Sequence, residues 1–385
     1  MASFEFATAS QILFGAGWLS RIGPLAAQAG QRVLVVNGRG AGMAGELFDI
    51  LAQAGVQALE FEVPGEPTVE LVQQGVDYAR QERADLVIGF GGGSALDVGK
   101  AVAILLTNPG EVLDYLEVVG KGRALVPPPL PCFAVPTTAG TGAEVTRNAV
   151  LGVPEQQVKV SLRSAHMLPR LALIDPQLTY SLPPEVTAST GLDALTQLVE
   201  PYFSNRAMPL TDAICREGMP RAAGALRRVY ENGQDAAARE QMCLASLFGG
   251  LALANARLGV VHGFAGVLGG LLQAPHGVIC AGLLPFVLEA NLRALQARQP
   301  DSPALARFDE VARLLTGNAT ATASQGIAWV QDLCQALQVP PLAAYGLRRE
   351  HFPQVIEKSA RASSMQGNPI VLSEAELGVI LEQAI

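Results

Sequence analysis

The first half of this chain alternates short β-branched runs with amphipathic helical runs, and this alternation restricts the fold more than any other feature. A strand, a helix and a second strand in succession form a parallel sheet that is covered by helices on both faces. Ligands of such sheets bind at the carboxyl ends of the strands. The predicted strands are Arg32–Asn37, Val56–Val63, Asp85–Phe90, Pro131–Pro136 and Ala172–Asp175, and the predicted helices between them are Gly45–Ala54, Val69–Ala84 and Ala95–Leu106.

The pattern changes near residue 180, where strand-like alternation disappears. Long runs rich in Ala and Leu follow, at 183–202, 209–230, 236–256, 258–295 and 303–316. A chain of 385 residues is long enough for two domains. We therefore predict an α/β domain with a parallel dinucleotide-binding sheet at 1–180, and an all-helical metal and substrate domain at 181–385.

Composition excludes several classes of partner. The formal charge is −8 and the chain has no basic run, so we expect neither nucleic acid nor a membrane surface as a partner. The apolar stretch at 258–288 contains glycines, two prolines and two histidines, which favours buried helices over a membrane span. The first six residues do not resemble a signal peptide, and the five cysteines have no close pairing. We expect reduced thiols and a cytoplasmic location.

A glycine-rich loop directly follows the third predicted strand. In Gly91-Gly92-Gly93-Ser94, glycines allow backbone N–H groups to approach a ligand, and the start of the next helix favours negative charge. This suits a pyrophosphate, although an ordinary tight turn is the alternative. The loop is neither a G-x-G-x-x-G fingerprint nor a P-loop. Asp97, in the first helical turns, is either a ligand-binding or a solvent-facing acid.

A second polar loop follows the fourth predicted strand. Residues 136–144 contain three threonine hydroxyls (Thr137, Thr138 and Thr141) and two glycines. Two such loops at neighbouring strand ends predict a shared ligand site. The first strand ends at Asn37, Gly38 and Arg39 instead of the acid that often binds a ribose 2′-hydroxyl, which favours NADP over NAD.

Four polar side chains interrupt the apolar helical half: Asp193, Gln197, His262 and His276. Asp193 and Gln197 are one helical turn apart and share a helix face. Two oxygens and two imidazoles are a plausible ligand set for a divalent cation such as iron or zinc. On an unbroken helix the two histidines would lie about 21 Å apart, so the chain must break between them, at Gly269-Gly270 and Pro275. Buried histidines and a buried Asp–Gln pair without metal are the alternative.

These motifs together resemble the iron-containing (group III) alcohol dehydrogenase family over nearly the whole chain. The similarity is carried by residues 91–100, 136–145, 191–196 and 274–277, and also by 173–179 and 367–369. It implies a dehydroquinate synthase-like architecture with the active site in the interdomain cleft, where hydride passes between NAD(P)(H) and a small alcohol or aldehyde. It further implies that Gly92, Gly93, Ser94, Asp97, Thr137, Thr138, Thr141, Asn148 and Lys159 hold the cofactor.

The resemblance assigns metal-ligand positions to Asp193, His262 and His276, but two positions depart from the family pattern. The fourth ligand is usually histidine and is Gln197 here, and a histidine that many members carry is Gly266 here. An amide oxygen is a poorer ligand for iron or zinc than imidazole, so weak or partial metal occupancy is an open alternative. The site is atypical for the family.

The resulting hypothesis is a metal-assisted NAD(P)-dependent alcohol dehydrogenase or aldehyde reductase, in which Asp193, His262 and His276 are catalytic. A homodimer is expected. Three alternatives remain. The first is a maleylacetate reductase-like enzyme with weak or no metal, although residues 275–279 differ from the usual sequence of those enzymes. The second is an NAD-dependent sugar-ring synthase, disfavoured because Arg257 is the one cation beside the 258–290 block. The third is a nucleotide-binding relic that has lost its metal.

Overall fold

The computed structural model describes the chain apart from residues 1–2, 39–43, 117–118 and 157, and it divides into two compact units. The α/β unit consists of Ala7–Thr138 and Gly142–Ser181. The helical unit consists of Met1–Phe6, Ala139–Thr141 and Leu182–Ile385. The main division follows Ser181, beside the predicted boundary at 180, and two short segments from the first half belong to the helical unit.

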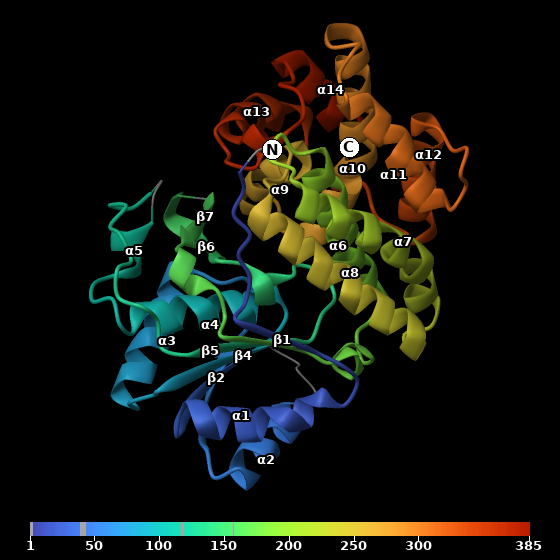
Figure 1. Ribbon diagram of the computed structural model, residues 1–385. Coiled ribbons are helices and arrows are strands. Elements are labelled where there is room, and N and C mark those ends of the chain that lie inside the picture. Colours follow the sequence, from blue (N-terminus) through green and yellow to red (C-terminus); the bar gives the residue numbers. More distant parts are fainter. Residues whose placement is uncertain (1–2, 39–43, 117–118, 157) are drawn as a thin grey trace. The chain divides into compact units, whose positions relative to one another are not determined.

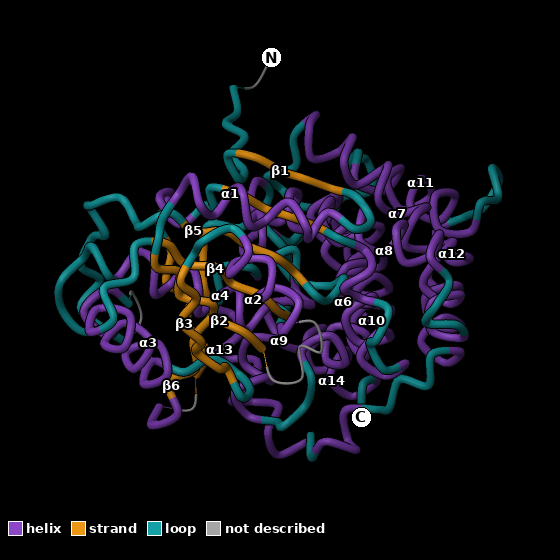
Figure 2. Tube along the Cα trace, turned by 90° about the horizontal axis from the view of Figure 1, so that it is seen from below, coloured by secondary structure: helices purple, strands orange, loops and turns teal. Residues whose placement is uncertain are grey.

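The α/β unit is built on a parallel sheet with strand order β1-β8-β5-β4-β2-β3 (Figures 1 and 2). Chain order moves outward from β2 to β3 and then returns to β4 on the other side of β2. The connections from β2 to β3 and from β4 to β5 therefore run in opposite directions across the sheet, so the carboxyl ends of β2 and β4 mark the topological switch point where such sheets bind ligands. The strands are β1 (Gln11–Phe14), β2 (Arg32–Gly38), β3 (Gln57–Val63), β4 (Leu86–Gly91), β5 (Cys132–Pro136) and β8 (Leu171–Ile174).

Helices cover both faces of the sheet, as the alternation predicts. On β2, Val33 and Val35 pack into the core on one face, while Leu34 and Val36 pack into the core on the other. A strand that is buried on both faces is apolar throughout, which is why β2 and β4 read as continuous hydrophobic runs. Figure 1 shows α1 (Ile22–Ala29) and α2 (Ala44–Gln53) on one side of the sheet, with α3 (Val69–Gln81) and α4 (Gly93–Leu105) on the other.

An antiparallel hairpin of β6 (Asn148–Val153) and β7 (Val158–Arg163) packs against α4, and the alternation did not predict it. A buried cation helps to hold it there. Lys100 Nζ donates to the Asn148 carbonyl oxygen at 2.5 Å and to Thr146 Oγ1 at 2.9 Å, and forms an ion pair with Asp97 Oδ1 at 2.9 Å. A lysine whose charge is compensated in this way can be fully buried.

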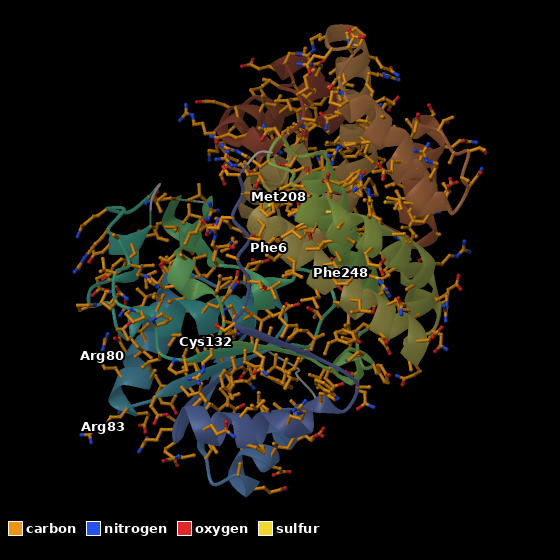
Figure 3. The ribbon with its side chains drawn as sticks, in the orientation of Figure 1. Phe6, Arg80, Arg83, Cys132, Met208 and Phe248 are labelled. Carbon is orange, nitrogen blue, oxygen red and sulfur yellow. The ribbon has the colours of Figure 1, made fainter. Side chains whose placement is uncertain are left out.

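Exposed charged side chains lie outside the hydrophobic cores of the α/β unit. Figure 3 shows Arg80 and Arg83 pointing outward from the end of α3, where both are exposed. Cys132, on β5, is buried in the core. Burial raises the pKa of the Cys132 thiol to about 12, opposed by Lys100. The described cysteines are free, in agreement with the prediction of reduced thiols.

The helical unit replaces strands with long packed helices. Close contacts among α6, α7 and α8 form its centre. The helices are α6 (Pro184–Phe203), α7 (Pro209–Glu231), α8 (Ala236–Asn255), α9 (Val260–Leu271), α10 (His276–Arg298), α11 (Ala304–Thr316), α12 (Ala323–Ala336), α13 (Phe352–Ala360) and α14 (Glu374–Gln383).

The predicted break between the two histidines is present. α9 ends at Leu271, and α10 begins at His276 with Pro275 as its N-cap. α10 is long and apolar enough to cross a membrane by length and composition, but 72% of its apolar window is buried inside the fold. This is the environment of a core helix of a globular protein.

Candidate metal centre and nucleotide loops

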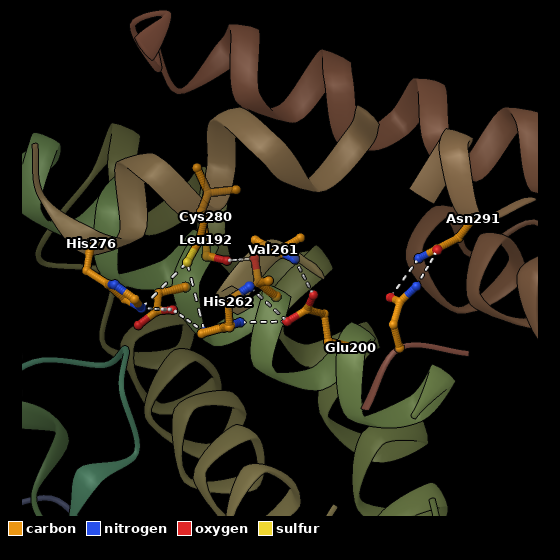
Figure 4. Close-up of polar contacts among 10 residues, drawn as sticks. Leu192, Glu200, Val261, His262, His276, Cys280 and Asn291 are labelled. Atoms are coloured by element: carbon orange, nitrogen blue, oxygen red, sulfur yellow. Dashed lines mark hydrogen bonds and ion pairs between the residues drawn. The ribbon is translucent and has the colours of Figure 1, made fainter. Parts of the chain in front are cut away.

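The predicted ligands Asp193, His262 and His276 come together within the helical unit. Asp193 lies in the middle of α6, His262 in the first turn of α9 and His276 at the first residue of α10. Asp193 Oδ1 is 3.4 Å from His262 Nε2 and 3.8 Å from His276 Nε2. Figure 4 shows both imidazoles directed toward the same point, where the Cys280 sulfur also lies.

The Asp193 carboxylate has an incomplete set of partners. Its residue is 2% exposed, and Oδ1 accepts no hydrogen bond among the described residues. A buried carboxylate oxygen without a partner carries a large desolvation cost. One ligand atom from each of Asp193, His262, His276 and Cys280 lies within 4.8 Å of all the others. A cation at their centre would satisfy the orphaned oxygen, so the residues present fit a divalent metal.

Glu200 orients one of the histidines. Its Oε2 lies 2.7 Å from His262 Nδ1, and its Oε1 accepts the backbone N–H of Val261 at 2.7 Å. Because a carboxylate can only accept, Nδ1 carries a proton, and on the neutral ring the lone pair therefore lies on Nε2, which faces the cluster. The backbone N–H groups at the start of α9 also favour this negative charge. This carboxylate–histidine pair is typical of metal-binding histidines.

The pKa values show that the cluster favours positive charge. Burial lowers the pKa of His262, but Cys280, Asp193 and Glu200 outweigh it and hold the pKa well above its ordinary value. The pKa of His276 is also raised, because Cys280 and Asp193 outweigh burial. Burial raises the pKa of Asp193, but the two histidines lower it further than that. A metal dication would supply the same compensation.

Access to the cluster is uneven. The His276 side chain is 37% exposed, while those of His262 and Asp193 are 7% and 3% exposed. One turn after His262, a Cβ placed on Gly266 would meet no atom within 4 Å. The position where relatives often carry a histidine is therefore open space beside the helix.

Gln197, the predicted fourth ligand, is buried one turn after Asp193 on α6. Its Oε1 accepts no hydrogen bond among the described residues, and it lies beside α8, 3.7 Å from a Cβ placed on Gly249. The structure thus gives Gln197 a buried, unpartnered oxygen, and it places a further candidate ligand atom, the Cys280 sulfur, within 4.8 Å of the ligand atoms of Asp193, His262 and His276.

Glu200 and Cys280 were not among the residues predicted from the sequence. Both carry a periodic signal, because Glu200 lies seven residues after Asp193 and Cys280 lies four residues after His276, which places each on the same helix face as a predicted ligand. That signal alone does not distinguish them from ordinary core positions.

The nucleotide loops meet at the carboxyl edge of the sheet. Gly91 has a φ of +152°, and a Cβ placed on it would come within 3.0 Å of the Gly38 backbone nitrogen. The carboxyl ends of β2 and β4 therefore approach so closely that glycine is required at position 91. α4 begins at Gly93 without a side-chain cap, so its first N–H groups remain available to an anion. This cradle fits a dinucleotide pyrophosphate.

Other predicted cofactor residues follow β4 and β5 along the chain. Gly92 faces Thr138, whose Cγ2 would be 3.4 Å from an added Cβ, and the Thr137 N–H donates to the Gly91 carbonyl oxygen. Gly92, Gly93, Ser94, Thr137, Thr138 and Thr141 are all partly accessible, and Thr141 belongs to the helical unit. Arg39 lies outside the described residues.

Three predicted cofactor residues have protein partners. Asp97 pairs with Lys100 and accepts the Val150 N–H at 2.8 Å, so its carboxylate supports the hairpin. Asn148 opens β6, and Lys159 on β7 forms an ion pair with Glu66 at 2.7 Å. The sequence predicted either a ligand-binding or a solvent-facing carboxylate at Asp97, and its role in supporting the hairpin is a third one.

Comparisons with known proteins agree with this architecture. Residues 9–176 match the family model "Iron-containing alcohol dehydrogenase", and residues 187–385 match "Fe-containing alcohol dehydrogenase family, C-terminal". The chain is 34% identical to 1,3-propanediol dehydrogenase of Klebsiella pneumoniae over 394 residues, covering 99% of this chain and 98% of that protein. A crystal structure of 1,3-propanediol oxidoreductase is similar over the full length of both chains, with a TM-score of 0.93 and 34% identity. Sulfoacetaldehyde reductase from Bifidobacterium kashiwanohense, solved with NAD+, has a TM-score of 0.87 and 26% identity over 100% of this chain and 99% of that chain.

The sheet, its glycine cradle and the carboxylate–histidine cluster define a nicotinamide-dependent oxidoreductase. The chain belongs to the iron-containing alcohol dehydrogenase family. Its activity class is that of an NAD(P)-dependent alcohol dehydrogenase or aldehyde reductase, as the hypothesis from the sequence stated.

Replacing Glu200 with glutamine should weaken metal binding without unfolding the chain. The amide retains the shape of Glu200 but loses the charge that holds the His262 Nδ1 proton. We expect the Zn²⁺ affinity to fall about 10- to 100-fold. Competition with a chromophoric chelator measures the affinity, and Glu240→Gln, an exposed position on α8, is the control. Equal affinities for both variants would contradict the orienting role.

Glu144, in the second nucleotide loop, should make stability depend on pH. Burial raises its pKa from 4.5 to about 7, opposed by its own backbone N–H and by Lys100. Because the folded state holds this proton more tightly than the unfolded chain, stability is complete below about pH 4.5 and decreases as pH rises to 7. The decrease amounts to about 3 kcal/mol for this group.

Thermal unfolding midpoints between pH 5 and 8 measure this effect. Glu144→Gln should flatten the decrease relative to the unmodified protein, while the exposed control Glu155→Gln should leave it unchanged. Parallel pH profiles for Glu144→Gln and the unmodified protein would show that Glu144 is ionised throughout.

Proposed function

We propose that this enzyme interconverts a small primary alcohol and its aldehyde, and that Asp193, His262 and His276 hold a divalent metal for this reaction. The observation that carries the proposal is the buried, unpartnered Asp193 Oδ1 facing two imidazole nitrogens. When bound, a metal at this site supplies Lewis-acid polarisation of the substrate oxygen.

The chain's own residues supply positioning and access. Glu200 keeps His262 in the tautomer that presents Nε2, and the partly exposed His276 marks the open side of the cluster. With glycine at 266 there is no imidazole to relay a proton, and the space beside it has room for water. We therefore assign the proton transfer to water or to a ribose hydroxyl of the cofactor.

The cofactor proposal rests on the cradle of Gly38, Gly91–Ser94, Thr137 and Thr138. Its nicotinamide supplies or accepts the hydride. We favour NADP over NAD because β2 ends in Asn37 and Gly38 instead of an acid. Glu60 on the neighbouring strand already has a partner, since it accepts a hydrogen bond from Asn37 Nδ2 at 2.9 Å. The sulfoacetaldehyde reductase solved with NAD+ supports the opposite choice.

Iron and zinc are both compatible with two imidazoles and a carboxylate. We further propose a cytoplasmic homodimer, supported by reduced cysteines and by the high apolar content of the sequence. The similarity to 1,3-propanediol dehydrogenase supports a short, hydroxylated substrate.

Aldehyde reduction by the purified enzyme tests the proposal. We expect loss of nicotinamide absorbance when NADPH or NADH is mixed with a panel of short aldehydes and added Zn²⁺ or Fe²⁺. Asp193→Ala should lower kcat/KM at least about 100-fold, because Lewis-acid stabilisation contributes several kcal/mol. Asp332→Ala, an exposed position on α12, is the matched control.

Two outcomes would oppose the proposal in different ways. Absence of turnover with every aldehyde, cofactor and metal would overturn the alcohol–aldehyde assignment. Full activity of Asp193→Ala would overturn the metal-assisted mechanism and favour the maleylacetate reductase-like alternative.

A further inference from the structure

We propose that Cys280 is a metal ligand in this enzyme, and that Asp193, His262, His276 and Cys280 form the ligand set in which Gln197 has no part. The inference rests on the proposed function, since it assumes a metal at the Asp193 cluster. Cys280 is not a ligand that the family resemblance implies. A sulfur ligand would also alter the metal preference of the site.

The two sulfur–nitrogen distances at Cys280 are close to those of a tetrahedral site. Its Sγ lies 3.7 Å from His276 Nε2 and 3.9 Å from His262 Nε2. For metal–sulfur bonds of about 2.3 Å and metal–nitrogen bonds of about 2.05 Å, tetrahedral geometry requires a sulfur–nitrogen separation of about 3.6 Å. The distances from Asp193 Oδ1 to the same nitrogens, 3.4 and 3.8 Å, compare with about 3.4 Å for oxygen and nitrogen ligands.

Local structure explains why the sulfur reaches this point. His276 and Cys280 are four residues apart on α10, so both side chains project from one face of its first turns. Gly277 allows this end of α10 to contact α6, because a Cβ there would lie 1.9 Å from the Ser189 carbonyl oxygen. The close approach brings the Cys280 sulfur within 4.8 Å of an Asp193 carboxylate oxygen, and Figure 4 shows Cys280 beside the two histidines.

The chemistry of the donor favours a thiolate over an amide. A Cys280 thiolate would bring a negatively charged, soft ligand atom directly to the metal, whereas Gln197 offers a neutral amide oxygen. The thiol proton leaves to solvent as the metal binds. Gln197 Oε1 lies 3.7 Å from a Cβ placed on Gly249 of α8.

The ligand set predicts metal preference. Thiolate is a soft ligand that selects zinc, whereas imidazole and carboxylate bind zinc and iron alike. We therefore expect this enzyme to prefer Zn²⁺ to Fe²⁺ when both are offered, although its relatives are described as iron-containing.

Cobalt substitution tests the inference without relying on turnover. Co²⁺ is titrated into the metal-free full-length protein while the near-ultraviolet sulfur-to-cobalt charge-transfer band is recorded. We expect the band in the unmodified protein and in Gln197→Ala, and its loss in Cys280→Ser. Loss of a residue that only orients a metal ligand lowers the metal affinity about 10- to 100-fold. Cys280→Ser removes a ligand itself, so it should weaken Co²⁺ binding by at least about 10-fold.

A matched cysteine separates ligation from packing. Cys334 on α12 is 3.6 Å from the carbonyl oxygen of Ala281, next to Cys280, so Cys334→Ser perturbs the same region and should keep the band. X-ray absorption of the Zn²⁺-loaded unmodified protein requires no variant, and it should show one sulfur at about 2.3 Å. This measurement tests whether sulfur binds the metal even if Cys280→Ser does not fold.

Failure of this inference differs from failure of the proposed function. Metal-dependent aldehyde reduction without a cobalt–sulfur band overturns the Cys280 assignment alone. A cobalt–sulfur band that persists in Gln197→Ala and disappears in Cys280→Ser, in a protein that reduces no aldehyde, supports the assignment and overturns the activity. Absence of any metal binding overturns the assignment and the metal-assisted mechanism together.

Discussion

The helical unit depends on one constraint, which is that the carboxylates of α6 must be compensated inside the protein. Asp193 and Glu200 are both buried, and each lies where another helix begins. Glu200 binds the backbone N–H of Val261 at the start of α9 and fixes the His262 ring. Asp193 faces the imidazoles of His262 and His276, the first residue of α10. Electrostatic compensation thus links three helices at one point.

In the α/β unit, the corresponding constraint is the close approach of the backbones at the carboxyl ends of β2 and β4. Gly91 can lie beside Gly38 because Gly91 has no Cβ, and α4 begins at Gly93 without a side-chain cap on its first N–H groups. Lys100 and Asp97 on the same helix then hold the β6–β7 hairpin by a buried ion pair and hydrogen bonds. One helix therefore combines an anion site at its first turn with a structural charge pair one turn later.

The departures from the family pattern have local physical counterparts. Loss of the usual histidine at Gly266 leaves open space, so the substitution costs no packing. Loss of the usual histidine at Gln197 leaves an unpartnered oxygen, but a sulfur from α10 lies beside the remaining ligands. A metal site that loses one donor can keep the same number of donors if a second helix face provides another.

The sequence by itself determined the α/β architecture, the helical second half and three of the candidate ligands that meet at the cluster. Those features depend on periodicity, on glycines after strands and on rare polar residues in apolar helices, all of which are local properties. Tertiary structure decided the rest. The β6–β7 hairpin is stabilised by Lys100, which lies 48 residues before Asn148. Glu200 and Cys280 acquire their roles because α6, α9 and α10 converge, and no spacing along one helix can specify which side chain of another helix it meets.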